Sequence, residues 1–401
     1  MLSYLPVTVF LLFRLFRNFY FHIAVTVPFF MGHGLTLTQI FSLESVYYLF
    51  KVLGDIPAGA LADNYSKRIS VALSGFVGAA GYFIMATGDT VLSFTVAQAM
   101  LGIAVALFSG ADSTAILDAL QKAGKERLYN LVESTGWAAR NLAFGAAAII
   151  GGFVAATYGP GVTWYLTGIS VLLSGFLILL LPDDRANGNA GERRSTFSLM
   201  KDVSRFMRQD LFVVGVLVYF ATVFSLVRVG LWFLQPMAQE LGFNISMNGV
   251  LFSGTIIISI IFGSLSSTLF SADRIKSSLI FVSGAGILFP LLWSIALGST
   301  DALSVIVAFS LGFILFGVLQ GLYDPVAKIW VAARIPADIR TTVLSTGSLV
   351  ANLVFACIGP LGGYLGDRFG ISAALAALAI LHAVPLCLAS YMLIRVRKNT
   401  E

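Results

Sequence analysis

Cysteine, histidine and charge are all scarce in this chain. Only two cysteines, Cys357 and Cys387, and three histidines occur among 401 residues. Both cysteines fall inside long apolar segments, which argues against a disulfide framework and against thiol chemistry. No histidine spacing resembles a metal site, and the phosphate-binding pattern Gly-x-x-x-x-Gly-Lys-Ser/Thr is missing. The sequence therefore predicts no metal, no cofactor, no enzymatic activity and no ATP drive within the chain.

Charged residues make up only 11% of the chain, whereas 58% of its residues are hydrophobic. So little polar surface cannot coat a water-soluble body of this size. Apolar runs of about 20 residues, each long enough to cross the bilayer as a helix, repeat from end to end. Because these runs do not alternate with polar residues, they predict helices and not barrel strands. The expected spans are residues 7–30, 38–62, 69–88, 92–120, 128–157, 161–181, 210–238, 247–270, 277–297, 303–333, 340–366 and 371–395.

Lysine and arginine are distributed unevenly between the polar breaks. If the N-terminus is cytoplasmic, the outer breaks hold only Arg368, and the inner segments hold Lys67, Arg68, Lys122, Lys125, Arg127, Arg185, Arg193, Arg194, Lys201, Arg205, Arg208, Arg274, Lys276, Arg334, Arg340, Arg395, Arg397 and Lys398. Basic residues accumulate on the cytoplasmic side, so both termini are expected there, with a bacterial inner membrane as the location. The net charge of +5 is accordingly a topology signal and a contact surface for anionic lipid, not for nucleic acid.

An internal repeat divides the chain into two related halves. Nine residues recur at an offset of 211 positions: Ser134, Thr135, Gly136, Asn141, Leu142, Phe144, Gly151, Gly152 and Gly159 match Ser345, Thr346, Gly347, Asn352, Leu353, Phe355, Gly362, Gly363 and Gly370. Residues 1–182 and 210–401 are therefore expected to form two six-helix bundles. A parallel repeat of this kind places a transport site at the seam near the membrane midplane. Residues 183–209 are expected to be a cytoplasmic linker, either a solvated tether or one that includes an interfacial helix.

The break between the second and third spans carries a recognisable motif. It reads Gly59-Ala60-Leu61-Ala62-Asp63-Asn64-Tyr65-Ser66-Lys67-Arg68. This resembles the cytoplasmic signature of the major facilitator superfamily, a Gly-x-Leu-x-Asp pattern followed by a basic pair. The resemblance implies an all-α membrane protein with twelve helices in two pseudo-symmetric bundles, which moves a small-molecule substrate by alternating access, and it is compatible with a monomer.

The same resemblance assigns roles to the motif residues. It implies that Gly59 permits close helix packing and that Asp63 sits beside a helix N-terminus of the other half. Lys67 and Arg68 would hold acidic partners and lipid phosphate, as part of a latch on the outward-open state. Asn64 and Ser66 replace a basic residue and a glycine that are common in the family, which predicts a weaker latch.

Two further runs bear on the kind of transporter. Gly359-Pro360-Leu361-Gly362-Gly363 resembles a run that many drug antiporters carry in the fifth helix, although here it lies in the eleventh. Gln98 stands four residues before Gly102, where proton-coupled exporters of this kind usually place an arginine. The resemblance favours proton-coupled efflux of an amphipathic compound, with sodium coupling and uniport left open. The alternatives are an organic-anion transporter working by uptake or exchange, and a sensor or assembly protein that moves nothing.

Ionisable residues inside the expected spans are costly unless they are paired or hydrated, so they are the candidates for function. The candidate substrate-cavity residues are Arg17, Asn18, His22, Tyr48, Lys51, Trp137, Arg140, Arg228 and Trp232. The proton-coupling candidates are Asp55, Glu133 and Asp112, and the gate or latch set consists of Gly59, Asp63, Lys67, Arg68, Asp118, Asp324 and Lys328. A positive cavity formed by Arg17, Lys51, Arg140 and Arg228 would favour the organic anion.

Structural alternatives exist for several of these residues. Lys51 and Asp55 could neutralise one another at a spacing of four. Arg14 and Glu133 could reach the interface by snorkelling, and His22 could be a packing residue instead of a proton carrier.

The mismatches within the repeat add one more expectation. Glu133, Trp137 and Arg140 correspond to Leu344, Ser348 and Ala351. The chemistry of this helix pair is therefore expected to lie in the N-terminal half.

Overall fold

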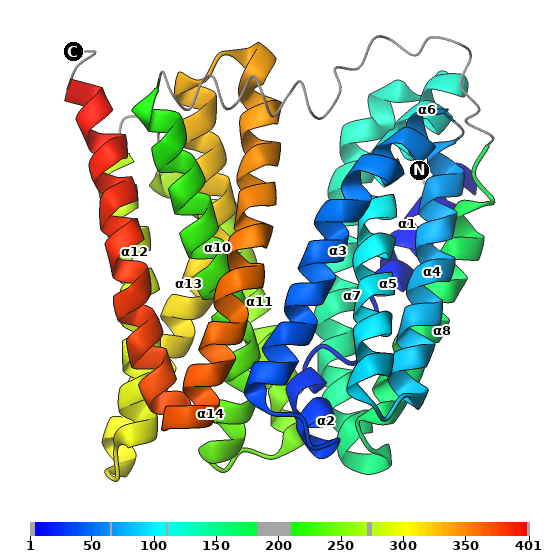
Figure 1. Cartoon of the computed structure of the whole chain (residues 1–401). Coiled ribbons are helices and arrows are strands. Elements are labelled where there is room, and N and C mark those ends of the chain that lie inside the picture. Colours follow the sequence, from blue (N-terminus) through cyan, green and yellow to red (C-terminus); the bar gives the residue numbers. More distant parts are fainter. Residues whose placement is uncertain (1–4, 65, 110, 183–209, 271–274, 399–401) are drawn as a thin grey trace. The chain divides into compact units, whose positions relative to one another are not determined.

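The structure, a computed structural model, describes residues 5–64, 66–109, 111–182, 210–270 and 275–398, where every regular element is helical (Figure 1). The helices are α1 (Leu5–Arg17), α2 (Thr26–Gly32), α3 (Leu37–Asn64), α4 (Lys67–Thr87), α5 (Val91–Phe108), α6 (Ala111–Lys122), α7 (Tyr129–Tyr158), α8 (Gly161–Ile178), α10 (Leu211–Glu240), α11 (Ile245–Leu269), α12 (Ile275–Gly298), α13 (Ala302–Arg334) and α14 (Ala337–Lys398), with one 3-10 turn, η1 (Glu126–Leu128). The expected linker, residues 183–209, lies outside the described residues.

The described helices account for the apolar segments of the sequence. Nine candidate spans are long and apolar enough to cross a membrane within the described ranges, and helices occupy all twelve expected segments. The last candidate, Ile339–Ile394, covers two expected spans. These two spans meet at a kink in α14, where Gly370 has a φ of 84°. Its repeat counterpart Gly159 ends α7 with φ at 87°, the left-handed region that glycine adopts readily. The chain is an all-α, multi-pass integral membrane protein.

Helix contacts divide the chain into two compact units, which are described separately. Unit 1 comprises residues 1–35, 46–193 and 243–253, and unit 2 comprises residues 36–45, 194–242 and 254–401. These units differ from the expected bundles because each includes the first turns of a helix, α3 or α11, whose remainder belongs to the other unit.

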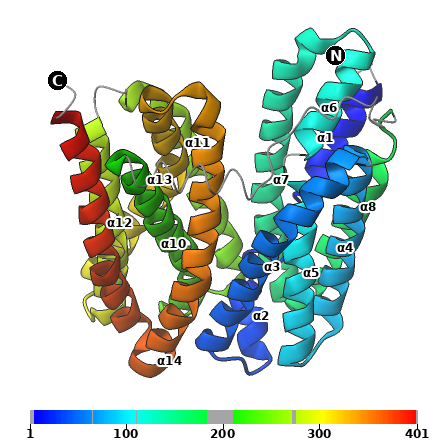
Figure 2. The same cartoon turned by 45° about the horizontal axis from the view of Figure 1, so that its top comes forward.

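In unit 1, α4 packs along both α5 and α8, and the turned view in Figure 2 shows the same neighbours. Glycine permits the closest approach, because a Cβ on Gly75 of α4 would lie 2.6 Å from the Cα of Gly175 in α8. Backbones that come this close gain contacts that longer side chains would prevent. In unit 2, α10 packs along α14, and α12 packs along α13 and α14.

One pair of repeated glycines, Gly136 and Gly347, makes equivalent packing contacts in the two units. A Cβ on Gly136 would lie 3.2 Å from the ring of Phe10 in unit 1. A Cβ on its counterpart Gly347 would lie 3.1 Å from the ring of Phe220 in unit 2. The shared residues therefore preserve a helix-packing scaffold.

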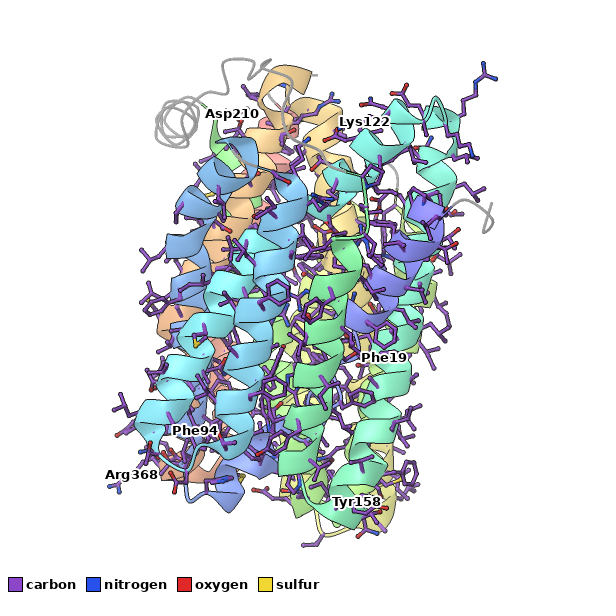
Figure 3. All side chains as sticks on the ribbon, turned by 90° about the vertical axis from the view of Figure 1, so that its right-hand side faces the viewer. Phe19, Phe94, Lys122, Tyr158, Asp210 and Arg368 are labelled. Carbon is purple, nitrogen blue, oxygen red and sulfur yellow. The ribbon has the colours of Figure 1, made fainter. Side chains whose placement is uncertain are left out.

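The first expected span, residues 7–30, is not one continuous helix. Residues 18–25, between α1 and α2, form turns. In Figure 3, Phe19 of this break lies between the end of unit 1 marked by Lys122 and the end marked by Tyr158. The break therefore lies at membrane depth, where non-helical backbone requires protein partners or water.

Two carbonyl groups in the last turn of α1 accept hydrogen bonds from side chains, one in the break and one on α8. The amide Nδ2 of Asn18 donates to the carbonyl oxygen of Arg14 at 2.8 Å. The hydroxyl of Ser170 donates to the carbonyl oxygen of Phe16, also at 2.8 Å. Such bonds compete with the helical ladder and explain why the helix stops in an apolar sequence without glycine or proline.

Substituting Gly75 with alanine tests the α4–α8 contact. The new Cβ must displace backbone, so we expect a loss of about 1–3 kcal/mol in the free energy of unfolding. Gly145→Ala is the matched control, since a Cβ there meets no heavy atom within 4 Å and alanine favours helix. Thermal unfolding of the purified variants in detergent measures both, and equal stability of the two variants would contradict the close contact.

Candidate functional site

Three helices of unit 1 bring ionisable side chains together around Arg14, in the last turn of α1. Its Nη2 lies 2.9 Å from Oδ2 of Asp112, in the first turn of α6. The same nitrogen lies 3.3 Å and 3.1 Å from Oε1 and Oε2 of Glu133 on α7, and 3.0 Å from Oγ of Ser113. We call these four residues the Arg14 cluster. The cluster brings two of the three proton-coupling candidates, Asp112 and Glu133, together with Arg14. The sequence had left open that Arg14 instead extends to the membrane interface by snorkelling.

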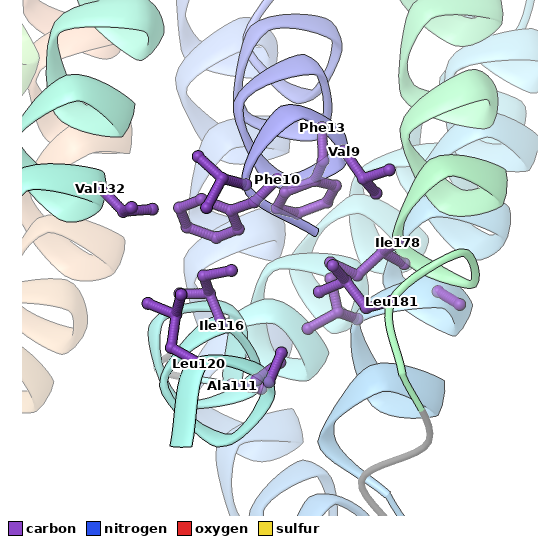
Figure 4. Packing of buried hydrophobic residues seen from close by; sticks show 14 residues of the cluster. Val9, Phe10, Phe13, Ala111, Ile116, Leu120, Val132, Ile178 and Leu181 are labelled. Atoms are coloured by element: carbon purple, nitrogen blue, oxygen red, sulfur yellow. The ribbon is translucent and has the colours of Figure 1, made fainter. Parts of the chain in front are cut away.

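The Arg14 cluster lies in apolar surroundings. Its side chains are 9% exposed for Arg14, 5% for Asp112 and 25% for Glu133. The guanidinium carbon of Arg14 lies 4.9 Å from the ring centroid of Phe10. Figure 4 shows Phe10 with Val132 and Ile116 in the buried apolar cluster of α1, α6 and α7. Charges in such surroundings interact strongly because water screens them little.

The charges within the cluster do not balance. One nitrogen atom, Nη2 of Arg14, faces four oxygen atoms but carries only two protons. The Oδ2 atom of Asp112 is buried and close to this nitrogen, yet the approach is too poorly aligned for a hydrogen bond. With both carboxylates ionised, the cluster has two negative charges against one positive charge.

Arg17, three residues further along α1, is in a different situation. Its side chain is buried, Nη1 donates to the hydroxyl of Tyr20 at 3.1 Å, and Nη2 donates to the hydroxyl of Ser74 at 3.3 Å. Its guanidinium carbon lies 5.1 Å from the ring centroid of Phe108. Within the described part of the chain it forms no ion pair with a carboxylate.

His22 is packed within the protein. Its ring stacks on Trp164 at 4.1 Å between centroids, and Nδ1 lies 3.1 Å from Oγ1 of Thr167. Only 7% of the residue is exposed. This geometry favours the packing role over the proton carrier. Asn18, also buried, supports the helix break as described above.

The remaining candidates are not brought together with the Arg14 cluster by any contact described. Tyr48 and Trp232 are buried, Lys51 and Arg228 are partly buried, and Trp137, Arg140 and Asp55 are exposed. Asp55 lies one turn from Lys51 on α3, and the two charges attract one another. In unit 2 the guanidinium carbon of Arg228 lies 5.1 Å from the ring centroid of Phe224. No group of three metal-ligating side chains occurs in the described ranges.

The basic pair of the motif fastens α4 to its neighbours inside unit 1. Nζ of Lys67 lies 2.7 Å from Oδ2 of Asp118 on α6. Arg68 donates to the carbonyl oxygens of Leu179 and Leu181, at 3.3 Å and 2.7 Å, just beyond α8. Ser66, which departs from the family glycine, caps α4 by accepting a hydrogen bond from the N–H of Ile69.

The other latch candidates give less support to that role. A Cβ on Gly59 would meet no heavy atom within 4 Å in the described part of the chain, so close helix packing at Gly59 stays a prediction. The side chain of Asp63 lies outside the described residues. Asp324 and Lys328 pair at 2.6 Å one turn apart on α13, with 40% and 56% of their side chains exposed. Pairs of this kind stabilise a helix surface weakly.

Sequence reasoning missed Asp367, which lies in α14 shortly before the kink at Gly370. It belongs to unit 2, where its carboxylate accepts hydrogen bonds from the backbone N–H groups of Leu37 at 2.9 Å and Thr38 at 2.8 Å, and from the Thr38 hydroxyl. Asp367 thus caps the N-terminus of α3. Burial raises the pKa of Asp367, but the hydrogen bonds from Thr38 and Leu37 outweigh burial and leave it below the ordinary value. The only signal was an acidic residue beside Arg368 in a short outer break.

Comparison with known proteins places this architecture in a family. The sequence model of the Major Facilitator Superfamily matches residues 9–314, more than half of the chain. The protein therefore belongs to the Major Facilitator Superfamily, whose fold and transporter class agree with the helical architecture above.

Solved structures agree on the fold. The crystal structure of the nucleoside transporter NupG has a TM-score of 0.77 and 16% identity, with 98% of each chain covered, and a point mutant of the same transporter gives a TM-score of 0.78. A D-xylose–proton symporter has a TM-score of 0.70 and 16% identity, with 95% of this chain and 96% of that chain covered. Identity this low supports the fold alone. No curated protein shows significant sequence similarity.

Replacing Arg14 by methionine tests the Arg14 cluster. The substitution keeps the apolar stem but leaves two carboxylates without their cation, so we expect a loss of about 3–5 kcal/mol in the free energy of unfolding. Thermal unfolding in detergent at neutral pH is the measurement.

Lys328→Met serves as the comparison, because it removes one partner of an exposed pair and should cost at most about 1 kcal/mol. A second variant, Arg14→Met combined with Glu133→Gln, should recover part of the stability. If Arg14→Met is as mild as Lys328→Met, the cluster does not hold these helices together.

Proposed function

We propose that this protein is a proton-coupled secondary transporter of a small organic molecule, which works by alternating access and takes its coupling proton at the Arg14 cluster. Family and fold support the transporter class. The observation that carries the coupling is the excess of one negative charge around Nη2 of Arg14. A proton on either carboxylate removes this excess and supplies a donor for the crowded oxygens.

The two carboxylates suit different parts of that task. Glu133 is the more exposed of the two, with 25% of its side chain exposed, and is the carboxylate that we propose receives the proton. Asp112 is 5% exposed and lies at the start of α6, where the helix dipole favours negative charge. Two carboxylates that share one cation titrate as a unit, so protonation of one changes the hold of Arg14 on both. Since they lie on different helices, the proton can bias the packing of α1, α6 and α7.

The proposed direction is export of an amphipathic compound, supported by the Gly359–Gly363 run that resembles one in drug antiporters. Uptake or exchange of an organic anion is the second candidate, and buried Arg17 favours it. The other cavity candidates remain proposals: Tyr48, Lys51, Trp137, Arg140, Arg228 and Trp232 for substrate contact, with Asp55 as the competing proton site.

The proposed topology has both termini in the cytoplasm of a bacterial inner membrane, supported by the distribution of basic residues. Alkaline phosphatase fused after Arg368 should then be active, because that segment faces the outside, and phosphatase fused to the C-terminus should be inactive. A green fluorescent protein fusion at the C-terminus should fluoresce. Activity of the C-terminal phosphatase fusion would reverse the topology.

Transport in inside-out membrane vesicles tests the function. Acidifying the lumen should drive accumulation of at least one of four probes, namely ethidium, carboxyfluorescein, uridine and xylose. Uridine and xylose are included because the structurally similar proteins are a nucleoside transporter and a D-xylose–proton symporter. Glu133→Gln and Asp112→Asn should lose accumulation, because the proton site is removed, and should retain counterflow exchange, which needs no proton. Asp55→Asn is the matched control and should retain both.

The outcomes separate the elements of the proposal. Loss of accumulation in Asp55→Asn with retention in both cluster variants would move the proton site to α3. Accumulation driven only by an alkaline lumen would replace export by uptake. Failure of all four probes to accumulate or exchange in either orientation would contradict transport of this substrate range.

A further inference from the structure

The most unusual side chain outside the proposed proton site is Arg17. It is 3% exposed, and its neighbours Tyr20 and Ser74 are neutral hydroxyls. Its Nε is buried and has no hydrogen-bond partner in the described part of the chain. A guanidinium keeps its charge at any physiological pH, so it cannot relieve this burial by losing a proton. A buried cation of this kind inside a membrane protein marks a site for an anion.

The helix break beside Arg17 is a second, independent sign of a ligand. The helical backbone ends at Arg17, and residues 18–25 follow as turns at the membrane depth marked by Phe19 (Figure 3). Discontinuous helices in transporters supply binding groups at this depth. Here the carbonyl oxygens of Arg14 and Phe16 are already bonded to side chains of the protein, so the group offered to a ligand is the guanidinium of Arg17. The unpartnered nitrogen and the broken helix therefore coincide on one segment of unit 1.

The surroundings indicate the class of ligand. A guanidinium presents a planar fork that matches the two oxygens of a carboxylate. The neighbouring side chains are aromatic. The guanidinium carbon of Arg17 lies 5.1 Å from the ring centroid of Phe108, and Tyr20, which accepts a hydrogen bond from Arg17, packs edge-on against Phe144 at 5.7 Å and lies 6.3 Å from Tyr82. A carboxylate with a small aromatic or aliphatic body satisfies both the charge and the apolar walls.

We propose that Arg17 is the anion anchor of the transport site and that the substrate is a small organic carboxylate. The inference rests on the proposed transport function and names its substrate class. Arg14 cannot take this role, because two carboxylates of the protein already occupy it. Arg17 therefore acts on the substrate, while the Arg14 cluster acts on the proton.

Ligand binding to the purified protein in lipid nanodiscs tests the anchor without requiring transport. The probes are benzoate and hexanoate, with benzamide and hexanamide as neutral counterparts, measured by calorimetry. We expect at least one carboxylate to bind and its amide not to bind. Arg17→Gln should weaken that binding by roughly 10- to 100-fold, and Arg17→Lys should weaken it less because it keeps the charge. Arg127→Gln, which removes an exposed arginine, should leave binding unchanged.

Thermal unfolding distinguishes an anchor from a structural role. Because Arg17 has no carboxylate partner in the described part of the chain, Arg17→Gln should unfold at the same or a higher temperature than the unmodified protein while binding is lost. A structural arginine would instead lower the unfolding temperature and be rescued by Arg17→Lys. The anchor is overturned if neither carboxylate binds better than its amide, or if Arg17→Gln binds equally well. Retention of binding in Glu133→Gln, with accumulation lost, separates this result from failure of the proton site.

Discussion

The ion pairs of Arg14 with Asp112 and Glu133 connect α1 to α6 and α7, which lie much further along the chain. They are enclosed by Phe10, Val132 and their apolar neighbours. Low local polarity makes each pair strong and each missing partner costly. The arrangement of α1, α6 and α7 thus depends on one guanidinium that pairs with two carboxylates. Stability and the proposed response to a proton would therefore depend on the same side chains.

Only the first copy of the repeat carries the Glu133 carboxylate of the Arg14 cluster. Gly136 and Gly347 make the same contact with an aromatic ring, so the packing requirement persisted in both halves. Glu133 has Leu344 as its counterpart, which has no charge to offer an arginine. Packing constraints act on every helix, whereas a charge is retained only where a partner compensates for its burial. Two halves with equivalent helix packing can therefore differ in the charged side chains that they carry.

The sequence was informative where the physics is local to one segment. Long apolar runs predict spanning helices, and Gly370 marks a helix end because glycine tolerates positive φ. Contacts between segments were harder to foresee. The partners of Arg14 and His22, which are Glu133 and Trp164, lie on α7 and α8.

Two features gave only weak signals in the sequence. No glycine or proline in the sequence predicts the break after Arg17, which depends on the side chains of Asn18 and Ser170. Asp367 caps a helix that begins 330 residues earlier in the chain, a pairing that no local pattern reveals. Such long-range partners become visible only when the folded chain brings the segments together.

The single copy of the Arg14 cluster would limit the energetics of the proposed proton-coupled transport. Under that proposal the one excess negative charge binds one proton, so each cycle would move a single proton per chain. One elementary charge that crosses 100 mV supplies about 2.3 kcal/mol. A neutral solute coupled one-to-one to that charge can reach a concentration ratio of roughly 50 between the two sides. Under the same proposal a second equivalent cluster would square that ratio, but Leu344, the repeat counterpart of Glu133, has no charge with which to form one.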